Sequence, residues 1–141
     1  MKNLPLILFI FLTLNVYAQK EANIWYFGEN AGLNFNTSPP QALGDGQLST
    51  REGCSSFSDA NGNLLFYVGA PSPSTEKVTI WDKNNNPMPN GVGLEGDASS
   101  SQSALTIPAP GQPNIYYLFT VGAPSSGNQG FWFYTIDMTL N

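Results

Sequence analysis

This chain carries one stretch twice: LFYVGAPS at residues 65–72 and LFTVGAPS at residues 118–125. The two copies agree at seven of eight positions and lie 53 residues apart. Each copy follows an Asn-containing turn and leads, through a Ser/Gly-rich gap, into a second run of apolar and aromatic residues. Self-similarity at periods of about 20 to 50 residues is typical of arrays, solenoids and propellers, whose units cannot bury a hydrophobic face alone. The duplication therefore predicts a β-repeat scaffold.

The residues around the two copies favour an all-β protein. No segment after residue 18 shows sustained helical periodicity, and short β-branched and aromatic runs alternate with turn residues. Asn61-Gly62 predicts a tight hairpin turn, because glycine supplies the positive φ that such turns need. We expect strands over residues 24–27, 33–36, 53–58, 64–68, 78–81, 103–107, 115–121 and 130–138.

Two repeat units are predicted after an N-terminal hairpin, repeat one over about residues 53–90 and repeat two over about residues 99–141. Their first strands align at an offset of 49 residues, 55–58 with 104–107. Their third strands align at the offset of 53 that the repeated stretch itself has. Each unit reads as strand, turn, strand, loop, strand, which resembles one blade of a β-propeller.

The expected fold class is all-β, with about two propeller-like blades and an N-terminal hairpin. A closed propeller needs at least four blades, so the domain is predicted to be an incomplete propeller. We expect the remainder of a longer chain, or other envelope proteins, to complete the array.

The N-terminus reads as a secretory signal peptide. Lys2 supplies a positive start, residues 4–14 form an apolar run, and residues 16–18 end in a small residue suited to cleavage. The apolar run is too short for a transmembrane helix. Residues 1–18 are thus predicted to be removed during export, leaving residues 19–141 as a partial β-propeller-like domain without a membrane span.

Charge excludes two classes of partner. Loss of Lys2 with the signal peptide takes the formal net charge from −5 to −6. The four remaining basic residues are scattered among ten carboxylates: Lys20, Arg51, Lys77 and Lys83. Because this chain has no basic patch, we do not expect it to bind nucleic acid or anionic membrane surfaces.

The residues absent from this chain exclude several kinds of catalysis. It has no histidine, which rules out a Ser-His-Asp triad, His-ligated zinc and imidazole acid/base chemistry. Cys54 is the only cysteine, so no intrachain disulfide and no thiolate metal cluster can form. We interpret Cys54 as a small buried residue at the start of a strand, the alternative being a reactive or intermolecular thiol.

Two pairs of acidic residues are the remaining catalytic candidates, Glu95 with Asp97 and Glu52 with Asp59. Glycoside hydrolysis needs two carboxyl groups that flank the scissile bond. Most aspartates here lie at turn positions, where the side chain caps the backbone. Turn chemistry is therefore the preferred interpretation, and no catalytic residue is assigned.

Residues 59–63, DANGN, resemble the opening of a calcium-binding loop. An EF-hand loop requires glycine at position six and glutamate at position twelve, where this chain has Leu64 and Ala70. A hairpin turn explains the segment, so no metal is assigned. Calcium held by loop oxygens from several segments is the alternative.

Residues 91–96, GVGLEG, match the glycine spacing of a dinucleotide fingerprint. That fingerprint functions between a strand and the start of a helix. Because Pro87 and Pro89 precede it and no βαβ unit is predicted, we interpret the segment as a loop and assign no cofactor.

The aromatic residues offer one further kind of site. Flat rings could form a sugar-binding platform, while recurrence at one position of each repeat favours packing between sheets. Packing is the preferred interpretation, and the ligand-binding residues are left unassigned. The rings concerned are Trp25, Trp81, Trp132, Tyr26, Tyr116, Tyr117 and Tyr134.

A series of short motifs resembles one group of exported proteins. The motifs are IWYFG (24–28), AGLNF (31–35), EGC (52–54), DANGNLLFY (59–67), TIWD (79–82), MPNG (88–91), SSQSA (100–104), Pro108 with Pro110, NIYY (114–117) and DM (137–138). Together they resemble the propeller-like N-terminal region of Bacteroidetes proteins that carry a gliding-motility-associated C-terminal domain for type 9 secretion. The resemblance implies a cell-surface location, through the periplasm, as part of a longer protein. It implies no catalytic residues.

The expected function is a non-enzymatic, exported scaffold or interaction module of a cell-envelope or surface protein, related to adhesion or gliding. The alternative is a carbohydrate-active or carbohydrate-binding propeller that uses acidic and aromatic residues, with glycans as partners.

Overall fold

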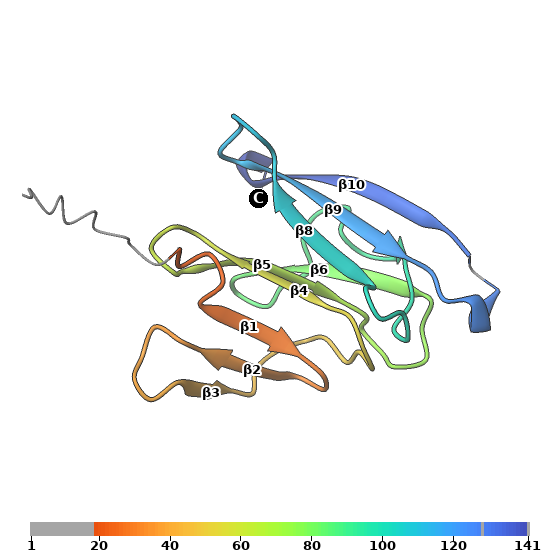
Figure 1. Cartoon of the computed structure of the whole chain (residues 1–141), viewed down its shortest axis with the longest axis horizontal. Helices are drawn as coiled ribbons and strands as arrows, with labels where there is room; N and C mark the ends of the chain where they lie inside the picture. The colour runs from red at the N-terminus through yellow and green to blue at the C-terminus, as the bar shows by residue number, and fades with distance from the viewer. Residues whose placement is uncertain (1–18, 128, 141) are drawn as a thin grey trace, which may run out of the picture.

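The computed structural model describes residues 19–127 and 129–140, so the predicted signal peptide lies outside the described residues. These residues form three antiparallel sheets and two short 3-10 turns, η1 (Pro124–Ser126) and η2 (Met138–Leu140). Figure 1 shows the sheets as successive layers of the fold. The all-β prediction is confirmed, while the described residues do not close into a propeller. In this part of the chain no helix is long and apolar enough to cross a membrane.

The first sheet has the order β1-β2-β3, with β1 (Ile24–Phe27), β2 (Ala31–Asn34) and β3 (Gln41–Leu43). The predicted N-terminal hairpin is present as β1 and β2, but the sequence did not predict the third strand. The chain resumes pairing after Pro39-Pro40, and β3 pairs with β2. A strand of three residues is too short to show the alternation by which strands are recognised in a sequence.

The second sheet has the order β4-β5-β6-β7. Its strands are β4 (Ser55–Ser58), β5 (Leu64–Gly69), β6 (Lys77–Asp82) and β7 (Leu94–Glu95). The predicted loop over residues 91–96 is corrected in part, since its last residues form β7 on the edge of this sheet. Lys77 lies opposite Glu95 in that pairing, and their side chains form an ion pair.

The third sheet has the order β10-β9-β8, with β8 (Ala104–Pro108), β9 (Ile115–Val121) and β10 (Phe131–Asp137). Its central strand contains the first part of LFTVGAPS, as β5, an inner strand of the second sheet, contains the first part of LFYVGAPS. Both copies of the repeated stretch therefore form an inner strand with a partner on each side.

The register of the sheets corrects the predicted alignment of the third strands. Tyr67 in β5 lies opposite Trp81, and Thr120, the matching position of β9, lies opposite Trp132. The two tryptophans are thus equivalent, at an offset of 51 residues in place of 53.

The first strands also align differently from the prediction. Phe57 lies opposite Phe66, and Leu105 lies opposite Phe119, the matching position of the second copy. The offset is 48 residues in place of the predicted 49, and it is smaller than the offset of 53 between the second strands because the turn of the second copy is five residues longer. Insertions in a surface turn cost little, so the sheets keep the same pairing around different loops.

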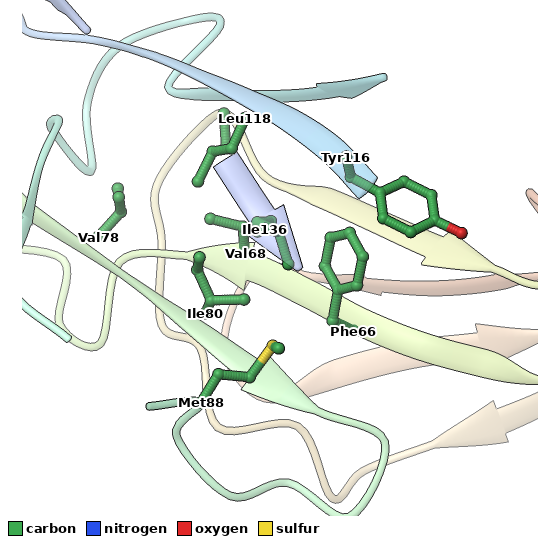
Figure 2. Close-up of a cluster of buried hydrophobic side chains, with 9 residues drawn as sticks. Phe66, Val68, Val78, Ile80, Met88, Tyr116, Leu118 and Ile136 are labelled. Carbon is green, nitrogen blue, oxygen red and sulfur yellow. The ribbon is translucent and has the colours of Figure 1, made fainter. Parts of the chain in front are cut away.

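A hydrophobic core fills the space between the second and third sheets. Strands β5 and β6 contribute side chains that face those of β9 and β10 across the gap (Figure 2). Its buried members are Phe66, Val68, Val78, Ile80, Met88, Ala104, Tyr116, Leu118 and Ile136. Full burial of one such large side chain stabilises the fold by about 1.5–3 kcal/mol, so this core holds the two sheets together.

A second core lies between the first and second sheets. The Tyr67 ring stacks on Tyr26 at a centroid distance of 4.4 Å and on Trp81 at 5.3 Å. Leu64 joins this core because the β4–β5 pairing shifts register at Ser58, which turns Leu64 to the face opposite Phe66. The second sheet is therefore covered on both faces and is the middle layer of the fold.

Candidate interaction surface

The outer face of the third sheet is apolar and exposed. Alternate residues of a strand point to opposite faces, so Leu105 and Ile107 of β8 point away from the core. Their exposed fractions are 50% and 40%, and those of Phe131 and Phe133 on β10 are 67% and 68%. Large hydrophobic side chains are thus presented to solvent from both edge strands.

The central strand completes this face. Phe119 lies opposite Leu105 and Phe133, and Val121 lies opposite Phe131. The rings of Phe119 and Phe131 stack at a centroid distance of 5.7 Å with 19° between their planes. We call this surface the third-sheet outer face, and its residues are Leu105, Ile107, Phe119, Val121, Phe131 and Phe133.

The same face of the second sheet is buried. Phe66 and Val68 occupy the positions of Phe119 and Val121 in the repeat, and both are fully buried against the third sheet. Ile80 lies opposite Val68 and is buried in the same core. The third sheet therefore repeats a core-forming face against which no other sheet packs in the described residues.

An uncovered face of this kind is unusual for a protein that acts alone. Large contiguous apolar patches on soluble proteins mark interaction sites, whereas single exposed hydrophobic residues are ordinary. Each large side chain that became fully buried would contribute about 1.5–3 kcal/mol. The third-sheet outer face is thus the strongest candidate functional surface of the described residues.

A second exposed aromatic surface lies on the first sheet. Trp25 and Phe27 flank the buried Tyr26 in β1 and are 48% and 37% exposed. Phe35, 38% exposed, packs its ring 4.9 Å from that of Trp25. Trp25 is also held in place because its Nε1 donates a hydrogen bond of 2.7 Å to the Ala22 carbonyl. We call Trp25, Phe27 and Phe35 the first-sheet outer face.

The aromatic residues considered as a sugar platform do not form one surface. Trp81 is buried between the first and second sheets, which confirms its predicted packing role. Trp132 pairs with the buried Thr120 and shares its face, so it points toward the second sheet. Only Trp25 of the three tryptophans is well exposed. Of the four tyrosines in that set, Tyr26 and Tyr116 are buried, and Tyr117 and Tyr134 are partly exposed.

Asp59 caps a turn, as the sequence predicted. Its Oδ1 accepts hydrogen bonds from the backbone N–H groups of Asn61 at 2.8 Å and Asn63 at 2.9 Å. The Asn63 side chain donates a third bond, to Oδ2. These donors, the Asn63 side chain first, hold the pKa of Asp59 below its usual range. The carboxylate is thereby committed to the turn.

The same turn occurs a second time at Asp82, and this recurrence was not predicted from the sequence. Asp82 Oδ1 accepts from the N–H groups of Asn84 at 2.8 Å and Asn86 at 2.9 Å. The fourth residue of each turn has positive φ, 89° at Gly62 and 66° at Asn85. The pattern Asp-x-Asn-Gly/Asn-Asn, read as a turn signature, could have revealed the second copy.

Each acidic residue of the two predicted pairs has a hydrogen-bond or ion-pair partner in the structure. Glu52 and Asp59 lie beyond opposite ends of β4, on the order of 20 Å apart at about 3.3 Å per strand residue. A glycosidase pair is at most about 10 Å apart. Glu95 is paired with Lys77, and the buried Asp97 accepts a 2.7 Å hydrogen bond from the Ser99 N–H. The described residues contain no group of acidic or thiol side chains suited to hold a metal ion.

A polar network that the sequence did not reveal joins the loop after β3 to the turn after β6. Asp45 accepts hydrogen bonds from the Tyr26 hydroxyl at 2.8 Å and from the Asn85 side chain at 3.1 Å. The Tyr67 hydroxyl donates to Asn85 at 2.8 Å and accepts from the Gln47 N–H at 3.0 Å. Because its members come from four separate segments, only the tertiary structure brings them together.

Burial and hydrogen bonding set the titration of this network. Burial raises the pKa of Tyr67 to about 12 and also raises the pKa of Tyr26. The hydrogen bond from Tyr26 holds the pKa of Asp45 below its usual range. A neutral tyrosine pair beside an ionised carboxylate is a stable structural arrangement at neutral pH.

Cys54 is partly buried and packs against the core between the first and second sheets. This burial raises the pKa of its thiol, which lowers the thiolate fraction at neutral pH. The predicted burial of Cys54 is thus only partial, and the raised thiol pKa disfavours the alternative of a reactive thiol.

Comparison of the chain with family models, with curated proteins and with solved structures finds no match. The two outer faces are accordingly defined by their own geometry and by the internal repeat.

Proposed function

We propose that this protein is a non-enzymatic, exported scaffold module with propeller-like stacked sheets, which binds a further β-sheet through the third-sheet outer face. The observation that carries the proposal is the equivalence of Phe66 and Phe119. One forms the core between two sheets, and the other occupies the same place on a sheet whose matching face is open. An exposed sheet face with the side chains of a hydrophobic core is suited to bind a partner that presents another apolar sheet face.

Export to the cell envelope is part of the proposal. It rests on the signal-peptide pattern of residues 1–18 and on the resemblance to surface proteins that use type 9 secretion. A role in adhesion or gliding, with other envelope proteins or further parts of a longer chain as partners, follows from the same resemblance. Low charge and many turn residues suit such a structural module.

The engagement of the acidic residues supports a non-enzymatic role. Asp59 and Asp82 are occupied by turn N–H groups, and Glu95 is paired with Lys77. The proposal would be overturned by hydrolysis of a polysaccharide that disappears in Asp59→Asn or Glu95→Gln.

The proposed surface is tested with a fluorescent apolar probe, anilinonaphthalene sulfonate, and the purified chain of residues 19–141. We expect the folded protein to bind the probe, and the double variant Phe131→Ser/Phe133→Ser to bind it several-fold less with an unchanged unfolding midpoint. Val92→Ser is the matched control, because Val92 is 63% exposed but lies in the loop before β7. Equal probe binding by the double variant and the wild type would show that the third-sheet outer face is not an apolar binding surface.

A further inference from the structure

The two exposed aromatic faces lie at opposite ends of the stack of sheets. Figure 1 shows the second sheet between the other two, with β1–β3 on one side and β8–β10 on the other. The first-sheet outer face points away from the core that contains Tyr26, and the third-sheet outer face points away from the core that contains Leu118. One molecule therefore has two unpartnered apolar ends.

The stack has a direction, and the two ends are of opposite kind. The face of the second sheet that carries Phe66 and Val68 is covered by the inner face of the following sheet. The third-sheet outer face repeats this leading face. The opposite, trailing face of the second sheet carries Tyr67 and is covered by the preceding sheet. The first-sheet outer face is the trailing face of the first layer, so the two ends can meet in the same order as the sheets inside the molecule.

Neither end carries charges that would oppose contact. The strands β1, β2 and β3 contain no charged residue, and Asp137 at the end of β10 is the only one in β8, β9 and β10. Burying an unpaired charge is expensive, whereas burying aromatic and aliphatic side chains is favourable. The aromatic rings on both ends are of the type that dominates interface cores.

We propose that two copies of this protein associate head to tail, the third-sheet outer face of one copy docking on the first-sheet outer face of the next. This inference rests on the proposed function, because it identifies the sheet that the third-sheet outer face binds. The contact joins two different surfaces, so it leaves one face of each kind free and can extend into rings or filaments.

The association is tested by light scattering and sedimentation of residues 19–141 over a range of concentrations. We expect the wild type to self-associate. Two variants each disable one end, Phe133→Glu on the third sheet and Trp25→Glu on the first, and each should weaken self-association by at least about 30-fold, the effect of losing an interface hot spot. Phe27→Glu replaces the latter variant if Trp25→Glu alters the near-ultraviolet circular dichroism of the fold.

Mixing the two variants identifies the geometry. Phe133→Glu keeps an intact first-sheet face, and Trp25→Glu keeps an intact third-sheet face, so an equimolar mixture should form a dimer although each variant alone is monomeric. Self-association of Trp25→Glu at wild-type strength, or a mixture that stays monomeric, would overturn the head-to-tail proposal. If the wild type is monomeric but binds the apolar probe through Phe131 and Phe133, this inference fails while the proposed function stands. If the wild type is monomeric and also does not bind the probe through Phe131 and Phe133, both this inference and the proposed function are rejected.

Discussion

Phe66 and Phe119 are the same residue of an internal repeat and point to the same side of their sheets, yet only Phe66 has a sheet packed against it. Phe66 is fully buried and meets the Tyr116 ring at a centroid distance of 5.2 Å. Phe119 stacks instead on Phe131 at the surface. The difference comes from what lies across each face, since the two phenylalanines occupy the same position of nearly identical stretches.

Truncation of these two phenylalanines should have unequal effects. Phe66→Ala removes a ring from a filled core and should lower the free energy of unfolding by about 3–5 kcal/mol. Phe119→Ala loses contacts on an open face and should cost about 1 kcal/mol, close to the mean effect of a point mutation. Urea unfolding of residues 19–141 measures both. Similar losses for the two variants would mean that the third-sheet outer face is part of a packed core.

Removal of either turn-capping aspartate should destabilise the second sheet. Asp59→Ala and Asp82→Ala each delete an acceptor of two backbone hydrogen bonds, and each should cost about 1–2 kcal/mol. Asp59→Asn and Asp82→Asn are the matched controls, because an amide oxygen can accept the same bonds. Thermal unfolding followed by circular dichroism compares the four variants, and equal loss in the Ala and Asn variants would contradict a capping role.

The protein should lose stability in acid through Asp45. Its pKa in the folded state lies below the ordinary value of 3.8, since the hydrogen bond from Tyr26 favours the ionised form. The stabilisation is therefore fully present above pH 3.8 and is lost as the pH falls through the lower folded pKa. In Asp45→Asn, urea unfolding should show a weaker dependence on pH in this window. An unchanged dependence would show that Asp45 is not linked to folding.

Stability should also fall in alkali, through Tyr67. Burial raises its folded pKa from 10.0 to about 12, so the unfolded chain releases the proton first. The contribution is complete below pH 10 and disappears as the pH rises toward 12, with a slope of at most about 1.4 kcal/mol per pH unit for one proton. Tyr67→Phe should have a lower free energy of unfolding at pH 8 but a shallower slope between pH 10 and 12. A slope equal to that of the wild type would contradict this account.

Local sequence predicted the features that depend on neighbours along the chain. The strand 115–121 was predicted with its observed bounds, because its β-branched and aromatic content is a local property. The turn at Asn61-Gly62 was predicted from residue types that adopt positive φ. The short strands β3 and β7 were missed, since each exists only through pairing with a longer neighbour.

The candidate surface could be predicted only in part. The sequence indicated that LFTVGAPS belongs to a repeat and that repeats need covered faces. It did not indicate which face of β9 would be covered, because Leu118 and Phe119 are both apolar and the choice depends on where the second sheet lies. The predicted offset of 53 placed Trp81 and Trp132 at similar positions of the two repeats, and only the register of pairing shows that the two positions are equivalent.

By itself the sequence determined that this is an all-β protein with a duplicated inner strand and aspartate-capped turns, because alternation and turn preferences act between residues close in the chain. The tertiary structure decided that Phe66 is buried while Phe119 is not, and that Tyr26, Asp45 and Asn85 share one network. Burial and pairing depend on residues far apart in the chain, so nearly identical local stretches can form a core on one sheet and an open face on the next.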